Sequence, residues 1–188
     1  MDEAIASARS LGLATIDLEV LVQNQEAIPI YERCGFVRTR RLVVLGRDAG
    51  PGPSGESRTA VEEIDVAAVI AGWDRLHSVP SPWQRSREVI GRLSDGIEAR
   101  GVMDDRGIVA GVIAQARPGV IQIVDLPMSR EASPRALEAA LAKSLEVHAD
   151  RPHVLANLPE DDPAFPVMTS MGFGERHAQH EMRLVPRR

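Results

Sequence analysis

Asn24 and Tyr31 are the two side chains whose types and spacing most clearly suggest chemistry. They stand on either side of the start of a short predicted helix, and Tyr31 is the only tyrosine of the protein. A phenol hydroxyl with a pKa of ~10 can give a proton to a strongly basic atom. However, an asparagine ahead of a helix often only caps it, and a lone helical tyrosine often packs in a core. Both residues therefore need a structural context before they are assigned a role.

Other polar side chains are weaker candidates. Cys34 is the single cysteine, which excludes an internal disulfide and any metal site built on cysteines. His177 and His180 lie close together in the sequence, but on a strand they point to opposite faces and cannot share an ion. Asp125 ends a predicted strand, where a functional carboxylate and a simple turn residue are equally expected. No metal site is expected.

Hydrophobic spacing indicates the elements that position these residues. Residues 4–11 have helical spacing, 14–21 alternate with period two, a helix begins near Ala27, and a strand covers 37–45. Gly, Pro and Ser dominate 47–58, which is the composition of a linker. The remaining pattern predicts strands at 59–64, 96–103, 108–117, 120–126, 153–158 and 175–185, and helices at 65–77, 80–93, 133–148 and 162–171.

The order helix, strand, short helix, Gly-Phe turn and strand occurs twice, near each end of the chain. Aligning Gly35 with Gly172 places Asn24 opposite Asp161, and Tyr31 opposite Met168. An internal repeat of this kind bears on the whole architecture. We therefore expect a half-domain at 1–46, a linker at 47–58 and a second, complete unit at 59–188.

The segment Asn24-Gln-Glu-Ala-Ile-Pro-Ile-Tyr-Glu-Arg-Cys-Gly-Phe36, set between two strand patterns, resembles the C-terminal half of a GNAT-type N-acetyltransferase domain. The resemblance implies an α/β (α+β) fold with a mixed, mostly antiparallel sheet flanked by helices. It also implies direct transfer of an acetyl group from acetyl-CoA to a primary amine. Tyr31 occupies the family position of the acid that protonates the leaving thiolate, and Asn24 and Ala27 occupy positions near the cofactor.

The family's phosphate-binding turn, Arg/Gln-x-x-Gly-x-Gly/Ala, opens a long helix whose backbone N–H groups hold the pyrophosphate. The first unit begins within that helix, so the turn is expected to be absent there. In the second unit Arg130 matches the leading position and would contact the cofactor. Ser133 and Arg135 replace the two small residues, and Pro134 removes an N–H donor. With Met168 in place of the tyrosine, the second unit is expected to be a degenerate copy.

Composition limits the partners. The net charge of -5 argues against binding to nucleic acid. No apolar run approaches the ~20 residues that span a bilayer, and the acidic N-terminus is unlike a signal peptide, so a cytoplasmic protein is expected. A small-molecule or peptide amine would be the acceptor, and an unpaired strand edge could be completed by a second copy. The alternative is a truncated or pseudo-acetyltransferase that serves as a non-catalytic binding or structural module.

Overall fold

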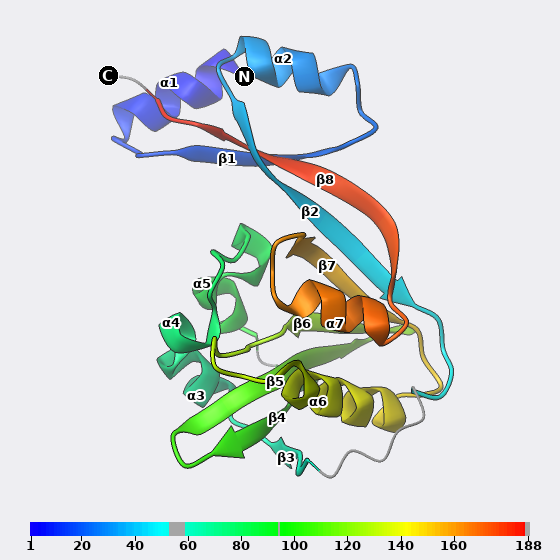
Figure 1. Cartoon of the computed structure of the whole chain (residues 1–188). Coiled ribbons are helices and arrows are strands. Elements are labelled where there is room, and N and C mark those ends of the chain that lie inside the picture. The colour runs from blue at the N-terminus through cyan, green and yellow to red at the C-terminus, as the bar shows by residue number, and fades with distance from the viewer. Residues whose placement is uncertain (53–58, 94, 187–188) are drawn as a thin grey trace.

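The computed structural model describes residues 1–52, 59–93 and 95–186. Its strands form one eight-stranded sheet in the order β1-β8-β2-β7-β6-β5-β4-β3 (Figure 1). The helices are α1 (Asp2–Ser10), α2 (Ala27–Arg33), α3 (Val66–Ala71), α4 (Trp73–Leu76), the 3-10 turn η1 (Trp83–Arg85), α5 (Arg87–Ile90), α6 (Pro134–Val147) and α7 (Ala164–Ser170). The strands are β1 (Ile16–Leu21), β2 (Val37–Arg47), β3 (Glu62–Glu63), β4 (Ile97–Asp104), β5 (Gly107–Arg117), β6 (Val120–Asp125), β7 (His153–Pro159) and β8 (Gly174–Leu184).

The sheet is mixed and mostly antiparallel. The parallel neighbours β6 and β7 pair only from Ile121 with His153 to Ile123 with Leu155, although both strands continue beyond that point. The two strands therefore diverge toward their C-terminal ends. The mixed, mostly antiparallel sheet flanked by helices, expected from the sequence, is confirmed.

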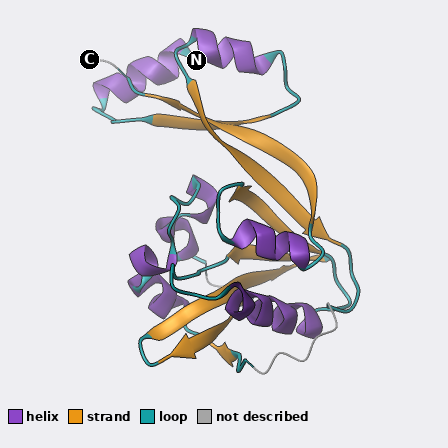
Figure 2. Cartoon of the chain, viewed as in Figure 1, coloured by secondary structure: helices purple, strands orange, loops and turns teal. Residues whose placement is uncertain are grey.

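Strands from the two ends of the sequence alternate in the sheet. β8 lies between β1 and β2, and β2 lies between β8 and β7, all antiparallel. Figure 2 shows β2 and β8 as two long strands that join a small lobe, containing α1, β1 and α2, to the rest of the molecule. We call these parts the N-terminal lobe and the C-terminal lobe. Each lobe contains strand residues from both ends of the sequence.

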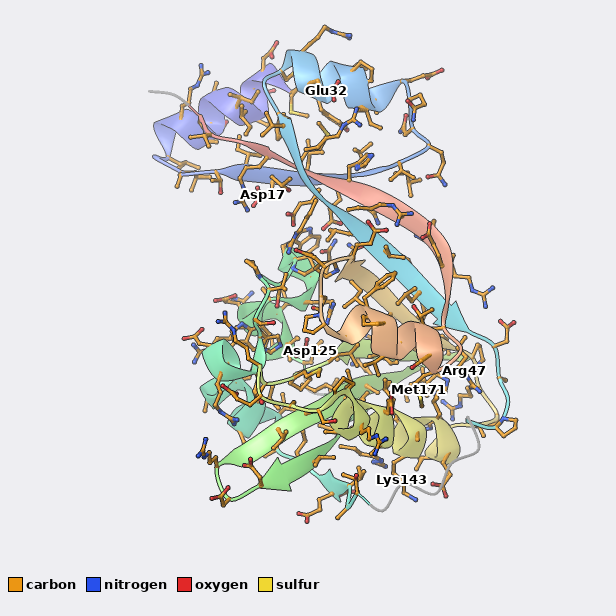
Figure 3. The ribbon with its side chains drawn as sticks, in the orientation of Figure 1. Asp17, Glu32, Arg47, Asp125, Lys143 and Met171 are labelled. Atoms are coloured by element: carbon orange, nitrogen blue, oxygen red, sulfur yellow. The ribbon has the colours of Figure 1, made fainter. Side chains whose placement is uncertain are left out.

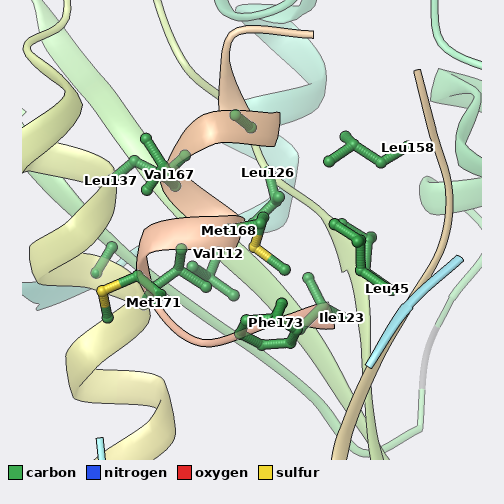
Figure 4. Packing of buried hydrophobic residues seen from close by; sticks show 14 of the residues in the cluster. Leu45, Val112, Ile123, Leu126, Leu137, Leu158, Val167, Met168, Met171 and Phe173 are labelled. Carbon is green, nitrogen blue, oxygen red and sulfur yellow. The ribbon is translucent and has the colours of Figure 1, made fainter. Parts of the chain in front are cut away.

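Three buried clusters follow from this arrangement. The main core packs α6 and α7 on one face of the C-terminal part of the sheet, and Figure 4 shows Met168 of α7 and Met171, which follows that helix, within it. A second cluster packs α3, α4 and α5 on the opposite face, because Val112 and Ile113 of β5 point to opposite sides. A smaller third cluster, around Phe36 and Met182, holds the N-terminal lobe together.

Most predicted elements are present, and the differences have local causes. The predicted helix at 65–77 is divided at Gly72 into α3 and α4. The predicted helix at 80–93 is only η1 and α5, since Pro82 and Ser86 have extended backbones. The predicted strand at 59–64 is reduced to Glu62–Glu63.

The predicted linker is only partly described, because residues 53–58 lie outside the described ranges. Its first residue, Arg47, still belongs to β2. Beyond the strand, the backbone N–H of Gly50 donates to the carbonyl oxygen of Ala149 at 2.8 Å. Residues 47–50 therefore contact the C-terminal lobe. The division into units at 1–46 and 59–188 stays a prediction.

Candidate functional site

The helix after β1 places the residues that the sequence singled out. Asn24 accepts a hydrogen bond on Oδ1 from the backbone N–H of Ala27 at 3.1 Å, and its carbonyl oxygen accepts from Ile28 at 3.2 Å. Asn24 thus stabilises the turn that leads into α2, whose N-cap residue is Glu26 and forms no side-chain cap bond. Gly35 then closes the helix with φ at 93°, a conformation that favours glycine. Asn24 itself is exposed, so its remaining amide hydrogens face solvent.

Tyr31 is half-buried in the third cluster. Its ring lies edge-on to that of Phe36, with centroids 6.1 Å apart. The same cluster includes Leu18 and Val20, so Tyr31 lies on the face of β1 to which these residues point. Within the described part of the chain, the Tyr31 hydroxyl forms no hydrogen bond. The phenol group is therefore not committed to a structural partner.

The opposite face of β1 carries Glu19, which sequence analysis missed. Its Oε2 accepts from Nδ2 of Asn157 at 2.8 Å and from Nε2 of Gln84. Its Oε1 is buried with no hydrogen-bond partner in the described structure. Burial and the negative charge of Glu181 raise the pKa of Glu19 above its ordinary value, outweighing the opposing hydrogen bonds and the charge of Arg40. A buried carboxyl group with a raised pKa is a candidate for proton exchange at a functional site.

Asn157 holds this arrangement in place from β7. It has φ at 55°, and it is the one described residue other than glycine with a positive φ. Such backbone strain tends to occur at functional sites, where the surrounding structure maintains it. Asn157 also accepts on Oδ1 from Nε2 of Gln179 at 3.3 Å. We call Glu19, Gln84, Asn157 and Gln179 the inter-lobe polar cluster, because they come from β1, η1, β7 and β8.

An ion pair beside the cluster links the two crossing strands. Arg40 of β2 contacts both carboxylate oxygens of Glu181 of β8, at 2.8 and 2.9 Å. Thr39 adds a hydrogen bond to the same carboxylate at 3.0 Å. The paired geometry fixes Glu181, while Glu19 keeps one free oxygen. Glu19 is therefore the carboxylate of this region that has a buried, unpaired oxygen among the described residues.

The C-terminal lobe contains a second polar group, centred on Asp125 at the end of β6. Asp125 is fully buried, and Figure 3 labels it beside the short helices of the C-terminal lobe. Its carboxylate contacts Nε2 of His77 at 2.9 Å and Nη2 of Arg85 at 3.2 Å. Burial lowers the pKa of His77, but the hydrogen bond and charge of Asp125 outweigh it and raise the pKa. His77 also stacks on Trp73, with centroids 3.7 Å apart.

Because it is paired on both oxygens, Asp125 anchors η1 and α4 to the sheet. Trp73, one of two tryptophans in these helices, is held by the stacking on His77, whereas Trp83 is 63% exposed.

The loop between β6 and α6 uses its own backbone donors. Met128 donates to the carbonyl oxygen of Leu76 at 2.8 Å, and Ser129 to that of Val109 at 2.9 Å. Arg135 donates its backbone N–H to Oγ of Ser133 at 3.3 Å, which caps α6. These N–H groups would have to lose internal partners before they could bind a phosphate. Arg130, which begins the predicted phosphate contact, is exposed in this loop.

Side chains of the main core fill the space where β6 and β7 diverge. Leu126, which follows β6, and Leu158 of β7 are both buried there, and Met168 is fully buried in the same cluster (Figure 4). A cofactor arm placed between these strands would have to displace packed side chains. The residue that replaces the tyrosine thus helps to close this gap.

The structure brings together some of the predicted site residues. Asn24, Ala27 and Tyr31 share one short helix and the turn before it in the N-terminal lobe. Arg130 lies in the other lobe, on the loop before α6. No group of three or more potential metal-binding side chains occurs among the described residues. No helix in the described ranges is long and apolar enough to cross a membrane.

Comparison with known proteins agrees with this architecture. No family model and no curated protein matches the chain. Among solved structures, a GCN5-related N-acetyltransferase from Sphaerobacter thermophilus superposes with a TM-score of 0.75 at 15% identity, over 100% of this chain and 66% of that one. A GCN5-related N-acetyltransferase from Kribbella flavida gives 0.65 at 16% identity, over 96% and 72%. The chain therefore has the fold of the GCN5-related N-acetyltransferases.

Another similar structure is a tandem GNAT protein from the clavulanic acid biosynthesis pathway, with a TM-score of 0.65 at 15% identity. It is matched over 99% of this chain and 68% of its own. The chain thus spans about two thirds of the length of these solved proteins.

Proposed function

We propose that this chain takes part in the transfer of an acetyl group from acetyl-CoA to a primary amine, at the edge of the sheet formed by β1. The observation that supports this most is the placement of two proton-transfer groups on opposite faces of β1. Tyr31 packs with Leu18 and Val20, and Glu19 points the other way with an unpartnered oxygen. The fold, which acetyltransferases share, supports the same proposal.

The two faces suit the two proton transfers of the reaction. The amine nitrogen attacks the thioester carbon, forming a C–N bond, and the C–S bond breaks. The attacking nitrogen and the leaving sulfur lie on different sides of that carbon, so acid and base can act from different faces. Glu19 would take the proton from the amine, and Tyr31 would give a proton to the thiolate. Asn24 and Ala27 would contact the pantetheine arm.

The C-terminal lobe would have a supporting role in a tandem arrangement of two acetyltransferase-like units. Its loop before α6 uses internal acceptors, and its strand divergence is packed with Leu126 and Met168. Through Gln84 and Asn157 it would instead orient Glu19 of the N-terminal lobe. Arg130 would contribute at most a peripheral contact to the cofactor.

Calorimetric titration with acetyl-CoA, followed by acetylation assays on a panel of primary amines, tests the proposal. We expect acetyl-CoA binding and turnover, with Tyr31→Phe lowering kcat by about 100-fold while the affinity for acetyl-CoA changes little. If Glu19 is the general base, the activity of the wild type should rise with pH as its carboxyl group loses its proton. Glu19→Gln should lower kcat/KM and remove this rise. Arg106→Ala, on the exposed turn before β5 in the other lobe, is the control and should retain activity. Absence of acetyl-CoA binding below millimolar concentration would refute the enzyme function for this polypeptide.

The second candidate function is a non-catalytic binding module. It is favoured by the internal use of the backbone donors of Met128 and Ser129 and by the full burial of Met168. Under this alternative Tyr31→Phe and Glu19→Gln would leave every measured property of the protein unchanged except stability.

A further inference from the structure

Residues 80–85, which end in η1, contact both lobes, and we call them the inter-lobe segment. On the side of the N-terminal lobe, Nε2 of Gln84 donates to Oε2 of Glu19 in β1. The carbonyl oxygen of Pro80 accepts from Nη1 of Arg40 in β2. Two of the three strands that form the N-terminal lobe are therefore hydrogen-bonded to this segment.

On the side of the C-terminal lobe, the segment is held by Arg85, the residue next to Gln84. Nη2 of Arg85 donates to Oδ1 of Asp125 in β6 at 3.2 Å, and both side chains are buried. The second oxygen of Asp125 contacts His77 at 2.9 Å. The charge of Arg85 also opposes the rise that burial causes in the pKa of Asp162, so Asp162 lies close as well. Arg85 is thus anchored among side chains of the C-terminal lobe.

The backbone of η1 makes the two neighbouring side chains move together. Pro82 precedes the turn with φ at -64°, and its carbonyl oxygen accepts from the backbone N–H of Arg85 at 2.9 Å. The backbone N–H of Ser86 donates to the carbonyl oxygen of Trp83 at 3.2 Å. A proline ring and two consecutive hydrogen bonds leave this turn little freedom. A displacement of Arg85 therefore also displaces Gln84.

At the other end, Gln84 provides one of two amide donors to Glu19, and Asn157 provides the second at 2.8 Å. Burial, and then the charge of Glu181 in β8, raise the pKa of Glu19. The two hydrogen bonds and the charge of Arg40 in β2 lower it. Because the amide donors stabilise the charged carboxylate, loss of Gln84 should favour the protonated form.

We propose that Arg85 is a positioning residue for Glu19: anchored on Asp125 in the C-terminal lobe, it holds Gln84 against the carboxyl group of the N-terminal lobe. None of the hydrogen bonds of Arg85 within the described residues reaches Glu19, so it acts through its neighbour. The relevance to acetyl transfer rests on the proposed function, in which Glu19 takes the proton from the amine. The C-terminal lobe would then contribute to the reaction without binding a cofactor.

The test follows the ionisation of Glu19 directly, by NMR of the full chain with isotope-labelled glutamate side chains. Glu19→Gln assigns the signal. Gln84→Ala removes one donor to the carboxylate and should raise its proton affinity by about tenfold. Arg85→Gln should raise it by about threefold or more, the lower end of the coupling expected between contacting residues. Wild-type ionisation of Glu19 in Arg85→Gln would overturn the proposal.

The double variant, Gln84→Ala with Arg85→Gln, separates positioning from long-range electrostatics. If Arg85 acts through Gln84, its replacement should have no further effect once Gln84 is alanine. Effects that add in full would show that Arg85 acts by its charge, and would refute the positioning role. Arg87→Gln makes the same charge change at an exposed position of α5 and is the matched control. It should leave Glu19 as in the wild type.

A second variant weakens the same contact from the other side, since Arg85→Gln leaves a buried carboxylate with one partner fewer and could impair folding. Asp125→Asn retains the size of the anchor and an acceptor oxygen. Loss of a negative charge alone would lower the proton affinity of Glu19, whereas a displaced Gln84 would raise it. We expect a rise, and a fall would contradict the proposal.

These measurements need neither acetyl-CoA nor turnover, so the two proposals can fail separately. A protein without acetyltransferase activity would refute the proposed function and leave the coupling of Arg85 to Glu19 measurable. In an active protein, the pH at which kcat/KM rises should shift upward in Arg85→Gln and stay unchanged in Arg87→Gln. Equal pH profiles in these two variants would refute the positioning role even though the enzyme is active.

Discussion

The segment from α2 to β2 and the segment from α7 to β8 have the same secondary structure, residue for residue. Each helix has seven residues, each strand has eleven, and each turn contains a glycine with positive φ, at 93° for Gly35 and 85° for Gly172. The backbone N–H of Phe36 donates to the backbone carbonyl oxygen of Tyr31 at 3.0 Å, and that of Phe173 donates to the backbone carbonyl oxygen of Met168 at 3.1 Å.

The side chains of the two segments differ in what they do. Met168 is fully buried in the main core, whereas Tyr31 is half-buried and its hydroxyl has no partner in the described structure. The same turn thus supports a packing residue in one lobe and an uncommitted polar group in the other. The backbone of the two motifs is the same, and they differ in whether the side chain at this position is fully packed or carries an unpaired hydroxyl.

The largest expected effect is on stability, at the packing residue. Met168→Ala should lower the free energy of unfolding by about 2–5 kcal/mol, because it removes a fully buried side chain from a packed core. Tyr31→Phe should change it by less than about 0.5 kcal/mol. Urea denaturation of both variants measures the difference. Similar losses at the two positions would show that Tyr31 is also a structural residue.

The second expected effect is on the pH dependence of stability, at His153, the first residue of β7. Burial, followed by the positive charges of His148 and Arg47, lowers the pKa of His153 from 6.5 to about 4. Below pH 6.5 the unfolded chain binds a proton that the folded chain does not. The free energy of unfolding should therefore fall as the pH decreases from 6.5 to 4, by at most about 3 kcal/mol.

His153→Leu should remove this part of the pH dependence, because leucine has no titratable group. Denaturant titrations at pH 7, 5.5 and 4 measure it. His177→Ala, at a half-buried position of β8, is the control and should keep the wild-type profile. A His153→Leu profile parallel to that of the wild type would contradict the assignment.

The two closing glycines should respond alike. Gly35→Ala and Gly172→Ala should each cost about 1–2 kcal/mol, because a left-handed conformation is unfavourable for alanine. Gly35→Ala should cost slightly more, since its new methyl group would lie 3.2 Å from Leu184. Gly174→Ala is the matched control, with no atom within 4 Å of the added methyl group and no positive φ. Melting temperatures test this order, and an equal loss in all three variants would refute it.

The smallest expected effect is at Glu19. Since its pKa is raised, its charged form is less favourable in the folded than in the unfolded chain, so stability falls as the pH rises above 4.5. Glu19→Gln should therefore melt about 1–2 °C higher than the wild type at pH 7 and at the same temperature below pH 4.5. Calorimetry at both pH values measures this. A lower melting temperature at pH 7 would mean that the carboxylate stabilises the fold.

Local signals in the sequence were sufficient to predict most elements. Hydrophobic period and caps identified α2, α3 and α6, and the caps at Asp65 and Ser133 form as expected, with bonds of 2.8 and 3.3 Å. The pairing of β8 with both β1 and β2 was not predictable in this way. It joins residues at opposite ends of the sequence, and no local pattern encodes such a contact.

The residues of the candidate site also differ in whether a local sequence pattern could identify them. Asn24 and Tyr31 belong to one short segment, so a motif could identify them, although their functional roles stay predictions. Glu19 alternates with Leu18 and Val20, a pattern that predicts an exposed side chain. It is shielded only because Gln84 and Asn157, from distant parts of the chain, lie against it. A buried carboxylate assembled in this way has no signature in its own neighbourhood.

The position of β8 between β1 and β2 has a consequence for biosynthesis. During translation, α1, β1 and α2 leave the ribosome long before β8, the strand at Gly174–Leu184 with which β1 pairs. At ~5–20 residues per second, the N-terminal lobe must wait for about 8–30 seconds with an apolar face uncovered. Its completion depends on contacts of very high sequence separation, which form slowly. Release of a nascent chain before residue 184 would thus leave both lobes unfinished, and chaperone dependence should be a property of this topology.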